Sequence, residues 1–236
     1  MSESTPSSPS ILLVGASRGI GYAMAKEFVK RGWHVAGTVR GGARGQLHEL
    51  ANRHPGQVEI EIADMTRPEQ LDSLRDRLAH RRFDVLFVNA GTANRDPAAP
   101  IAQITTEEFI HVMVTNALSP IRTIETLGEL VTAAGLLGVM SSGQGSVANN
   151  EQGGRELYRG SKAALNMFMR SYAARHAGSA RAFLLLAPGW IRTELGGPDA
   201  PFTLEETIPD IVNTLIEKLG RPGLEYLDRK GRTVPW

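Results

Sequence analysis

A short apolar run that leads straight into a glycine-rich turn is the feature that most constrains this chain. Residues Ser10–Val14 read SILLV, which is typical of a parallel strand buried on both faces. Gly15, Gly19 and Gly21 follow at once, and a helical pattern then runs to about Gly32. Glycines at a strand-to-helix junction permit a tight turn, and the helix N-terminus offers free N–H groups to an anion. The pattern predicts a pyrophosphate-binding turn of a dinucleotide site.

The same alternation of strands and helices continues along the chain. Further strands are expected at residues 34–39, 58–62, 83–88, 135–140, 182–186 and 224–227. Helices are expected at 68–80, from 105 onward, from about Tyr158 until Gly178 stops the helix, and at 205–219. This order predicts an α/β protein with a single-domain Rossmann fold. We expect a doubly wound, mainly parallel sheet of about seven strands with helices on both faces. Residues 10–236 would form the domain, and the polar residues 1–9 a disordered tail.

Composition excludes several classes of function. The chain of 236 residues has no cysteine, which rules out disulfides, thiolate catalysis and cysteine metal sites. Its formal net charge is +1, so nothing favours binding to nucleic acid or to an anionic membrane. The six histidines show no metal-ligand spacing, and no apolar run approaches membrane-spanning length. We therefore expect a cytoplasmic protein without a metal, whose one basic cluster is a solvated helix face: Arg75, Arg77, Arg81 and Arg82 with Asp72 and Asp76.

Tyr158 and Lys162 are the strongest candidates for chemistry. Residues four apart lie one above the other on a helix face. A nearby ammonium favours phenolate and lowers a tyrosine's pKa, which makes the phenol a plausible proton donor. One ammonium is not enough to bring that pKa to neutrality, so a second cation, such as a bound cofactor, is expected. Taken alone, the pair is also a common coincidence in helices.

Polar residues at the ends of predicted strands suggest how a cofactor is held. Arg40 follows the second strand, where dinucleotide-binding folds meet the adenosine ribose, and no acidic residue stands there. Arg18 and Arg40 could clamp a 2′-phosphate, which predicts a preference for NADP(H) over NAD(H). The alternative is two surface arginines. Asp64 could accept a hydrogen bond from adenine, and Asn89 is equally compatible with a structural role in a turn.

A proline interrupts the helix that a capping box of Thr105 and Glu108 is expected to open. Pro120 has no N–H to give to the carbonyl four residues earlier, which belongs to Asn116. We expect a kink there, with the Asn116 carbonyl free to bind water or a ligand. A tolerated bend without chemical purpose is the alternative.

These motifs stand in a recognisable order: Gly15-Ala16-Ser17-Arg18-Gly19-Ile20-Gly21, Asp64, Asn89-Ala90-Gly91, Asn116, Ser141-Ser142, Tyr158 with Lys162, and Pro188-Gly189-Trp190-Ile191-Arg192-Thr193. In this order they resemble the single-domain branch of the short-chain dehydrogenase/reductase family, from about residue 10 onward. Residues 143–156, 196–200 and 228–236 are similar to the small carbonyl-reductase branch that includes sniffer-type reductases and the bacterial C-factor.

The resemblance implies roles for individual residues. Tyr158 would be the general acid in carbonyl reduction, and Lys162 would hold the nicotinamide ribose and lower the tyrosine's pKa. Ser142, rather than Ser141, would bind the substrate carbonyl, and the Asn116 carbonyl would hold a water that relays protons. The implied cofactor-binding set is Gly15, Ser17, Arg18, Gly19, Ile20, Gly21, Arg40, Asp64, Met65, Asn89, Ala90, Gly91, Tyr158, Lys162, Pro188, Gly189, Ile191 and Thr193.

Two departures from the family pattern leave alternatives open. Sixteen residues separate Ser142 from Tyr158, more than is usual, and we attribute the excess to the loop around Gly153 and Gly154. The segment after Thr193 is short, which suggests an open pocket. The expected function is NADPH-dependent reduction of an aldehyde, ketone or quinone by a homodimer or homotetramer. The alternative is a cofactor-binding regulatory or signalling protein of the same fold with little or no turnover.

Overall fold

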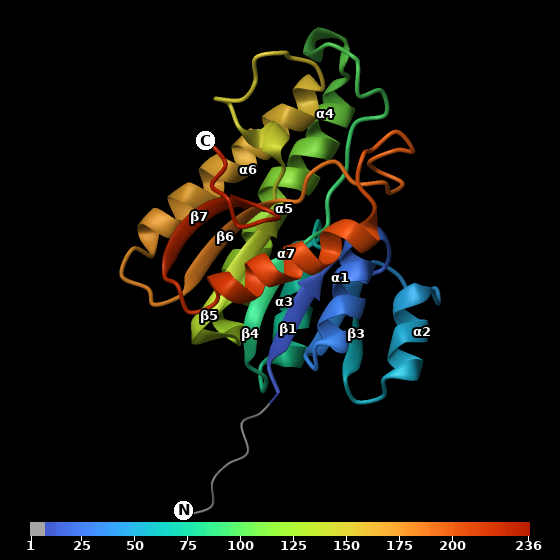
Figure 1. Ribbon diagram of the computed structural model, residues 1–236, viewed down its shortest axis with the longest axis vertical. Coiled ribbons are helices and arrows are strands. Elements are labelled where there is room, and N and C mark those ends of the chain that lie inside the picture. The colour runs from blue at the N-terminus through green and yellow to red at the C-terminus, as the bar shows by residue number, and fades with distance from the viewer. Residues whose placement is uncertain (1–7) are drawn as a thin grey trace, which may run out of the picture.

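The computed structural model describes residues 8–236, which form one seven-stranded sheet in the order β3-β2-β1-β4-β5-β6-β7 (Figure 1). Every neighbouring pair of strands runs parallel. The predicted doubly wound α/β fold is therefore confirmed. The strands are β1 (Ser10–Val14), β2 (His34–Val39), β3 (Val58–Ile62), β4 (Phe83–Val88), β5 (Val131–Met140), β6 (Ala182–Ala187) and β7 (Gly223–Asp228).

The central strands are apolar throughout because both of their faces are covered. Ile11, Leu12 and Leu13 of β1 have no exposed surface, and β6 is buried along its whole length. Strand β5 begins four residues earlier than its apolar pattern predicts. Its pairing with β4 shifts register between Phe83 and Val85, which lets Val131 join the sheet ahead of the regular run.

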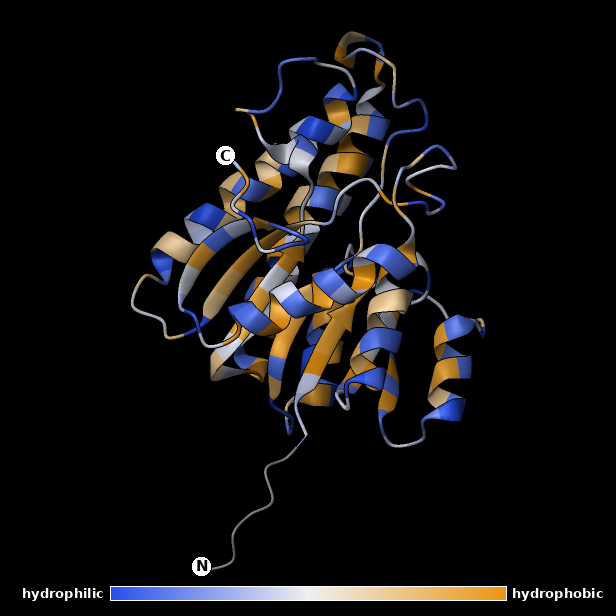
Figure 2. Cartoon of the chain, viewed as in Figure 1, coloured by the Kyte–Doolittle hydropathy of each residue, from blue (hydrophilic) through white to orange (hydrophobic). Residues whose placement is uncertain are grey.

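Helices divide between the two faces of the sheet, and each layer encloses its own core. One core packs α1 (Gly19–Lys30), α2 (Gln46–Arg53) and α7 (Leu204–Lys218) against the sheet. The other packs α3 (Pro68–Leu78), α5 (Ser119–Leu127) and α6 (Glu156–Arg175) against the opposite face. Figure 2 shows the result: apolar strands lie between helices that are apolar on one side and hydrophilic on the other.

Helix α2 was missing from the expectations drawn from the sequence. It has only eight residues, its N-cap is Gly45, and its buried side chains are Leu47 and Leu50 alone. Two apolar positions are too few to establish a helical period. The other predicted helices agree with the structure to within about two residues, the usual uncertainty of helix ends.

The predicted irregularity near Pro120 is present and takes the form of a π-helical turn. This turn, η2 (Val114–Leu118), lies between α4 (Thr106–Met113) and α5. Pro120 falls in the first turn of α5, where its missing N–H is tolerated. Such π-turns are frequent at functional sites. The segment that contains Asn116 is therefore conformationally unusual, as its sequence predicts.

The predicted capping box at the start of α4 is only half formed, so that prediction was wrong in part. The Thr105 hydroxyl accepts a 3.2 Å hydrogen bond from the Glu108 N–H. The Glu108 carboxylate does not return the bond to Thr105, because it accepts the N–H of Arg95 at 2.5 Å. Glu108 thus ties the loop after β4 to the helix.

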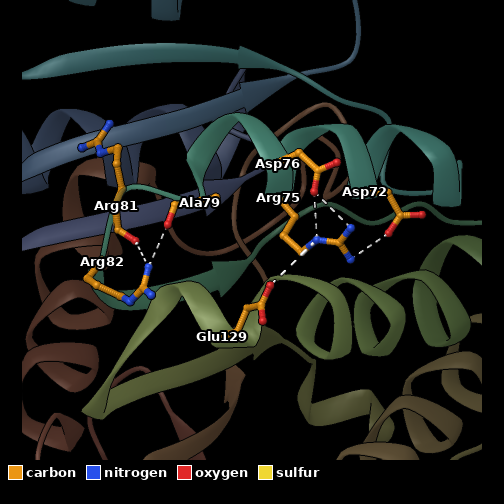
Figure 3. A network of polar contacts seen from close by, with 7 residues as sticks. All are labelled: Asp72, Arg75, Asp76, Ala79, Arg81, Arg82 and Glu129. Atoms are coloured by element: carbon orange, nitrogen blue, oxygen red, sulfur yellow. Dashed lines mark hydrogen bonds and ion pairs between the residues drawn. The ribbon is translucent and has the colours of Figure 1, made fainter.

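The basic cluster on α3 is neutralised by neighbouring acids. Arg75 bonds Asp72 and Asp76 at 3.1 Å and lies 3.8 Å from Glu129, which follows α5 (Figure 3). Arg77 and Arg81 pair with Glu61 and Glu59 of β3. Exposed pairs of this kind add little stability. Arg82, which follows α3, donates to the carbonyls of Ala79 and Arg81 instead of to a carboxylate.

The predicted N-terminal tail and the predicted lack of a membrane span differ in how far the structure describes them. The predicted tail falls mainly on residues 1–7, outside the described residues. Within residues 8–236, no helix is both long and apolar enough to cross a membrane.

Candidate active site

A cleft of about 1250 Å³ opens at the carboxyl edge of the sheet. It runs from the turn after β1, across the ends of β4 and β5, to the N-terminus of α6 and the segment after β6. Parallel sheets bind ligands at this edge. The predicted residues that line it are Gly15, Ser17, Arg18, Gly19, Ile20, Arg40, Asp64, Met65, Asn89, Ala90, Gly91, Ser142, Tyr158, Lys162, Pro188, Gly189, Ile191 and Thr193.

Gly21, which is also predicted to contact a cofactor, is buried and does not line the cleft. It lies behind the turn, where a Cβ would meet the Gly15 carbonyl oxygen at 2.0 Å. Gly15 itself has φ +87°, and a Cβ there would meet the Ala90 Cβ at 2.7 Å. The glycines thus bring α1, the turn and the end of β4 closer together than side chains allow. This cradle leaves room for a pyrophosphate at the N-terminus of α1.

Asn89 supports the glycine turn, which agrees with the structural role in a turn that was one of the two predictions for it. Its side-chain amide donates a 2.9 Å hydrogen bond to the Gly15 carbonyl, and its N–H bonds the Val14 carbonyl at 2.9 Å. Thr38, at the end of β2, accepts the Gly15 N–H at 2.9 Å through its hydroxyl. The turn is therefore fixed by polar contacts from two neighbouring strands.

The adenosine end of the cleft carries two arginines and an ionised carboxylate. The Asp64 carboxylate accepts the N–H and hydroxyl of Thr66 at 2.9 and 2.7 Å. Burial opposes ionisation of Asp64, but these bonds and the charges of Arg40 and Arg67 outweigh it and lower its pKa. Arg40 is exposed on the cleft wall, whereas Arg18 pairs across the cleft with Glu194.

Tyr158 and Ser142 meet at the other end of the cleft despite their wide separation in sequence. Contact with the Ser142 hydroxyl and the charge of Arg155 both lower the pKa of Tyr158. Burial of the phenol has the larger effect, so the pKa of Tyr158 is raised overall. The net pKa of Tyr158 therefore lies above its ordinary value, in contrast to the lowering expected from a neighbouring lysine.

Lys162 lies beneath Tyr158 with a buried, desolvated ammonium. Its Nζ is 5.9 Å from the centroid of the Tyr158 ring and donates a 2.9 Å bond to the Met140 carbonyl. Burial lowers the pKa of Lys162 to about 8. The Met140 carbonyl thus holds the ammonium at the end of β5, within reach of the face of the phenol ring.

The two serines after β5 have different surroundings. The Ser141 hydroxyl is buried and donates a 2.6 Å bond to the Asn166 side chain. The Ser142 hydroxyl accepts the Gln144 N–H at 3.2 Å and faces the cleft, while the Ser142 carbonyl accepts the Tyr226 hydroxyl. Of the pair, only Ser142 keeps a donor hydrogen for a molecule in the cleft.

Asn116 is fully buried and does not line the cleft. Its side-chain amide donates to the Thr92 carbonyl at 2.8 Å and to the Ser161 hydroxyl at 3.0 Å. Ser161 in turn donates to the Tyr158 carbonyl at 2.8 Å. The side chain therefore connects η2 to the helix that carries Tyr158 and Lys162, while its neighbours Val114 and Thr115 reach the cleft wall.

The segment after β6 is held in a compact turn. The Thr193 hydroxyl accepts the Gly196 N–H at 3.0 Å, and the Trp190 indole donates to the Gly196 carbonyl at 2.7 Å. Trp190, half exposed, covers part of the cleft mouth. Residues of this short segment from Trp190 to Gly196 also line the cleft, and the open pocket that its length predicts stays a prediction.

Several residues of the site were not expected from the sequence. Thr38, Gln144, Trp190 and Arg155 line the cleft, and Tyr226 supports it from β7. Thr38 could have been found from its position at the end of β2. The others depend on tertiary contacts that no local pattern reveals. Within residues 8–236, no cluster of His, Asp or Glu is arranged to hold a metal ion.

A Rossmann sheet whose glycine turn shares one cleft with a serine, a tyrosine and a lysine defines a nucleotide-dependent oxidoreductase. A family model described as enoyl-(acyl carrier protein) reductase matches residues 15–211. The chain belongs to the short-chain dehydrogenase/reductase family.

Similar proteins place the chain near the carbonyl reductases. A Burkholderia multivorans protein solved with bound NADP is 60% identical, with a TM-score of 0.96 over 97% of this chain and 100% of its own. A carbonyl reductase from Pseudomonas aeruginosa PAO1, in complex with NADP, is 33% identical, with a TM-score of 0.89 over 98% and 100%. The C-signal of Myxococcus xanthus is 31% identical over 65% of this chain and 92% of its own. The expected family and branch are confirmed.

Proposed function

We propose that this protein reduces a carbonyl compound to an alcohol with NADPH. The observation that carries the proposal is that Ser142, Tyr158 and Lys162 line the same cleft as the glycine turn. NADP is bound in the 60% identical Burkholderia protein, and a 33% identical relative is a carbonyl reductase. Both support the same cofactor and reaction class here.

The residues present fit a nicotinamide dinucleotide. The pyrophosphate would lie on the turn from Gly15 to Ile20, and the adenine end beside Asp64 and Met65. Ala90, Gly91, Pro188, Gly189, Ile191 and Thr193 would border the nicotinamide half. When bound there, the dinucleotide supplies the hydride.

The preference for NADP(H) over NAD(H) would come from Arg40 and Arg18, which would bind the ribose 2′-phosphate. Arg40 is exposed at the adenosine end, and no acidic residue takes its place to bind a ribose 2′-hydroxyl. The pair between Arg18 and Glu194 is largely exposed and therefore weak, so a 2′-phosphate can replace the carboxylate.

The proton would come from Tyr158. Its raised pKa keeps the phenol protonated at neutral pH, the form that a carbonyl acceptor requires. Ser142 would donate its hydrogen to the same carbonyl oxygen and hold it near the phenol. Lys162 would hold the nicotinamide ribose, and a water on the Asn116 carbonyl would return protons to Lys162.

Assembly and location are part of the same proposal. Residues 10–236 would act as one domain, in a homodimer or homotetramer in the cytoplasm. The exposed apolar residues Phe109, Leu118 and Phe168 of α4, η2 and α6 favour association through these helices.

NADPH consumption with a panel of aldehydes, ketones and quinones tests the function. We expect turnover by the wild type and a loss of at least a hundredfold in Tyr158→Phe, because the proton donor is gone. Tyr172→Phe, a buried tyrosine on the same helix, should keep wild-type activity. Near-normal turnover by Tyr158→Phe would refute the mechanism. Tight NADPH binding without any turnover would favour the regulatory alternative.

A further inference from the structure

We infer that the substrate of this site carries a carboxylate close to its carbonyl group and that Arg155 binds this carboxylate. The inference rests on the proposed carbonyl reduction and specifies its substrate. Arg155 lines the cleft, and its guanidinium carbon lies 5.4 Å from the centroid of the Tyr158 ring. A positive charge therefore faces the position of the reacting carbonyl.

The backbone that presents Arg155 is unusual. Arg155 is the only non-glycine residue with positive φ in residues 8–236, at +52°. Gly153 and Gly154 precede it with φ of +65° and +68°, and the helix α6 begins at the next residue. Only glycine adopts such angles without strain, so arginine is an unfavourable choice for the turn itself. We therefore look to the Arg155 side chain, and not to the backbone, for the reason that arginine stands here.

The guanidinium has no partner of its own. No ion pair or hydrogen bond joins it to any residue in the range 8–236, and its Nε is buried without an acceptor. Arg159, one turn further along, instead bonds the Gly154 carbonyl at 2.9 Å. A buried N–H without an acceptor is costly, and a bound anion would satisfy it.

A carboxylate is the anion that best fits the Arg155 guanidinium. The planar guanidinium fork matches two carboxylate oxygens, and its central carbon lies within cation–π distance of the Tyr158 ring. Because the same tyrosine would protonate the carbonyl, the two groups of the substrate must lie within a few bonds of each other. The substrate class is therefore a short oxo acid.

This assignment also accounts for the long connection between Ser142 and Tyr158. The extra residues form the turn that includes Gly153 and Gly154, and this turn ends in Arg155 beside the phenol ring. The longer loop does not displace Ser142, which still contacts Tyr158. What it adds to the site is a cation.

Matched neutral and anionic substrates test the inference. The probes are 2-, 3- and 4-formylbenzoate and 4-oxobutanoate, each against its methyl ester, with NADPH. We expect kcat/KM to favour at least one acid over its ester in the wild type. Arg155→Met should lower kcat/KM for that acid by roughly tenfold to a hundredfold more than for its ester. Arg155→Lys should restore part of the loss, because it keeps the charge but not the fork.

Two controls separate this effect from folding and from overall charge. Arg155→Gly relieves the positive φ, so it should fold at least as well as the wild type and still lose the preference for acids. Arg53→Met removes the same charge from exposed α2, away from the cleft, and should leave the preference unchanged. Equal loss for acids and esters in Arg155→Met, or equal kcat/KM for every acid and its ester in the wild type, would overturn the inference.

Binding separates failure of this inference from failure of the proposed function. Benzoate, phthalate, succinate and phenyl phosphate are titrated calorimetrically into the protein with saturating NADP⁺. Binding of one carboxylate that weakens about tenfold or more in Arg155→Met supports the inference even if no carbonyl is turned over. Turnover of carbonyls without Arg155-dependent carboxylate binding, or tighter binding of phenyl phosphate than of any carboxylate, contradicts it.

Discussion

The side-chain nitrogen of Lys162 donates a 2.9 Å hydrogen bond to the carbonyl oxygen of Met140, the last residue of β5. This single bond holds a buried ammonium at the point where the cleft meets the sheet. It does not compensate fully for lost hydration, since burial lowers the pKa of Lys162 to about 8. The residue proposed to hold the ribose is therefore a source of instability in the unliganded protein.

Lys162→Met should stabilise the unliganded protein at pH 7. The lysine pKa falls from 10.5 unfolded to about 8 folded, so below pH 8 the fold carries the full cost of the buried charge. We expect a gain of about 1–3 kcal/mol in the free energy of unfolding, reduced by the unpaired Met140 carbonyl. The wild type loses protons on folding between pH 8 and 10.5, so the gain should shrink across that window. Urea denaturation at pH 7 and 9.5 measures both.

Lys218→Met is the control for that experiment. Lys218 is just as buried, but its ammonium pairs with Glu225 at 2.7 Å and bonds the Arg221 carbonyl at 2.7 Å. Removing a paired buried lysine leaves its partners unsatisfied, so Lys218→Met should lose about 1–3 kcal/mol. A Lys162→Met variant less stable than wild type at pH 7 would contradict the prediction.

The two directions of the reaction should respond differently to pH. Burial raises the pKa of Tyr158 above its ordinary value of 10.0, so the phenol stays protonated through neutral pH. Carbonyl reduction should lose no activity through Tyr158 between pH 6 and 9, whereas alcohol oxidation, which needs phenolate, should rise with pH over that range. Arg155→Met removes a charge that lowers this pKa, and should reduce oxidation of a neutral alcohol several-fold at pH 9. Initial rates of reduction with NADPH and of oxidation with NADP⁺, measured across this pH range, check both expectations. The prediction would be contradicted if the wild-type reduction rate fell with pH according to a pKa below 8 and Tyr158→Phe did not show this fall.

Tyr226→Phe should lower kcat more than it changes KM. The Tyr226 hydroxyl donates to the Ser142 carbonyl and so positions the serine opposite Tyr158. Loss of this bond should cost about 0.5–1.5 kcal/mol of stability and reduce kcat several-fold. Tyr172→Phe is the matched control, because its hydroxyl makes no hydrogen bond to residues 8–236. Equal effects of Tyr226→Phe and Tyr172→Phe on kcat would contradict the hypothesis that the Tyr226 hydroxyl positions Ser142.

The sequence predicted the frame of the site better than its details. Buried strands and glycine turns follow from local chemistry, so the sheet and the ends of β1, β4 and β5 were placed correctly. The pairing of Tyr226 with Ser142 joins residues 84 apart, which no spacing rule predicts. Spacing also cannot distinguish a glycine that faces a ligand from one such as Gly21, which lies against the Gly15 carbonyl behind the turn. The net pKa of Tyr158 depends on burial, which only the folded structure supplies.

Cofactor preference should depend on the charges at the adenosine end. Arg40→Asp should weaken NADPH binding by about tenfold or more and narrow or reverse its advantage over NADH, because it replaces a phosphate partner with a repelling carboxylate. Glu194→Gln should strengthen NADPH binding modestly, since it frees Arg18 from its ion pair. Calorimetric affinities for both dinucleotides decide this; equal wild-type affinities for NADPH and NADH would refute the assignment.

Gly21→Ala should separate the packing of the turn from helix propensity. Gly21 lies in α1, where alanine alone would add about 1 kcal/mol of stability. The new Cβ, however, would lie 2.0 Å from the Gly15 carbonyl oxygen and 2.6 Å from the Asn89 amide nitrogen. The turn must move to relieve this contact, so we expect a net loss of about 1–3 kcal/mol and weaker NADPH binding. Gly160→Ala in α6 has the same propensity gain and no atom within 4 Å of its Cβ, so it should be more stable than the wild type. Both substitutions add one methyl group to a helix. If urea denaturation shows a lower free energy of unfolding for Gly21→Ala and a higher one for Gly160→Ala, the difference is due to the close approach of α1 and the turn.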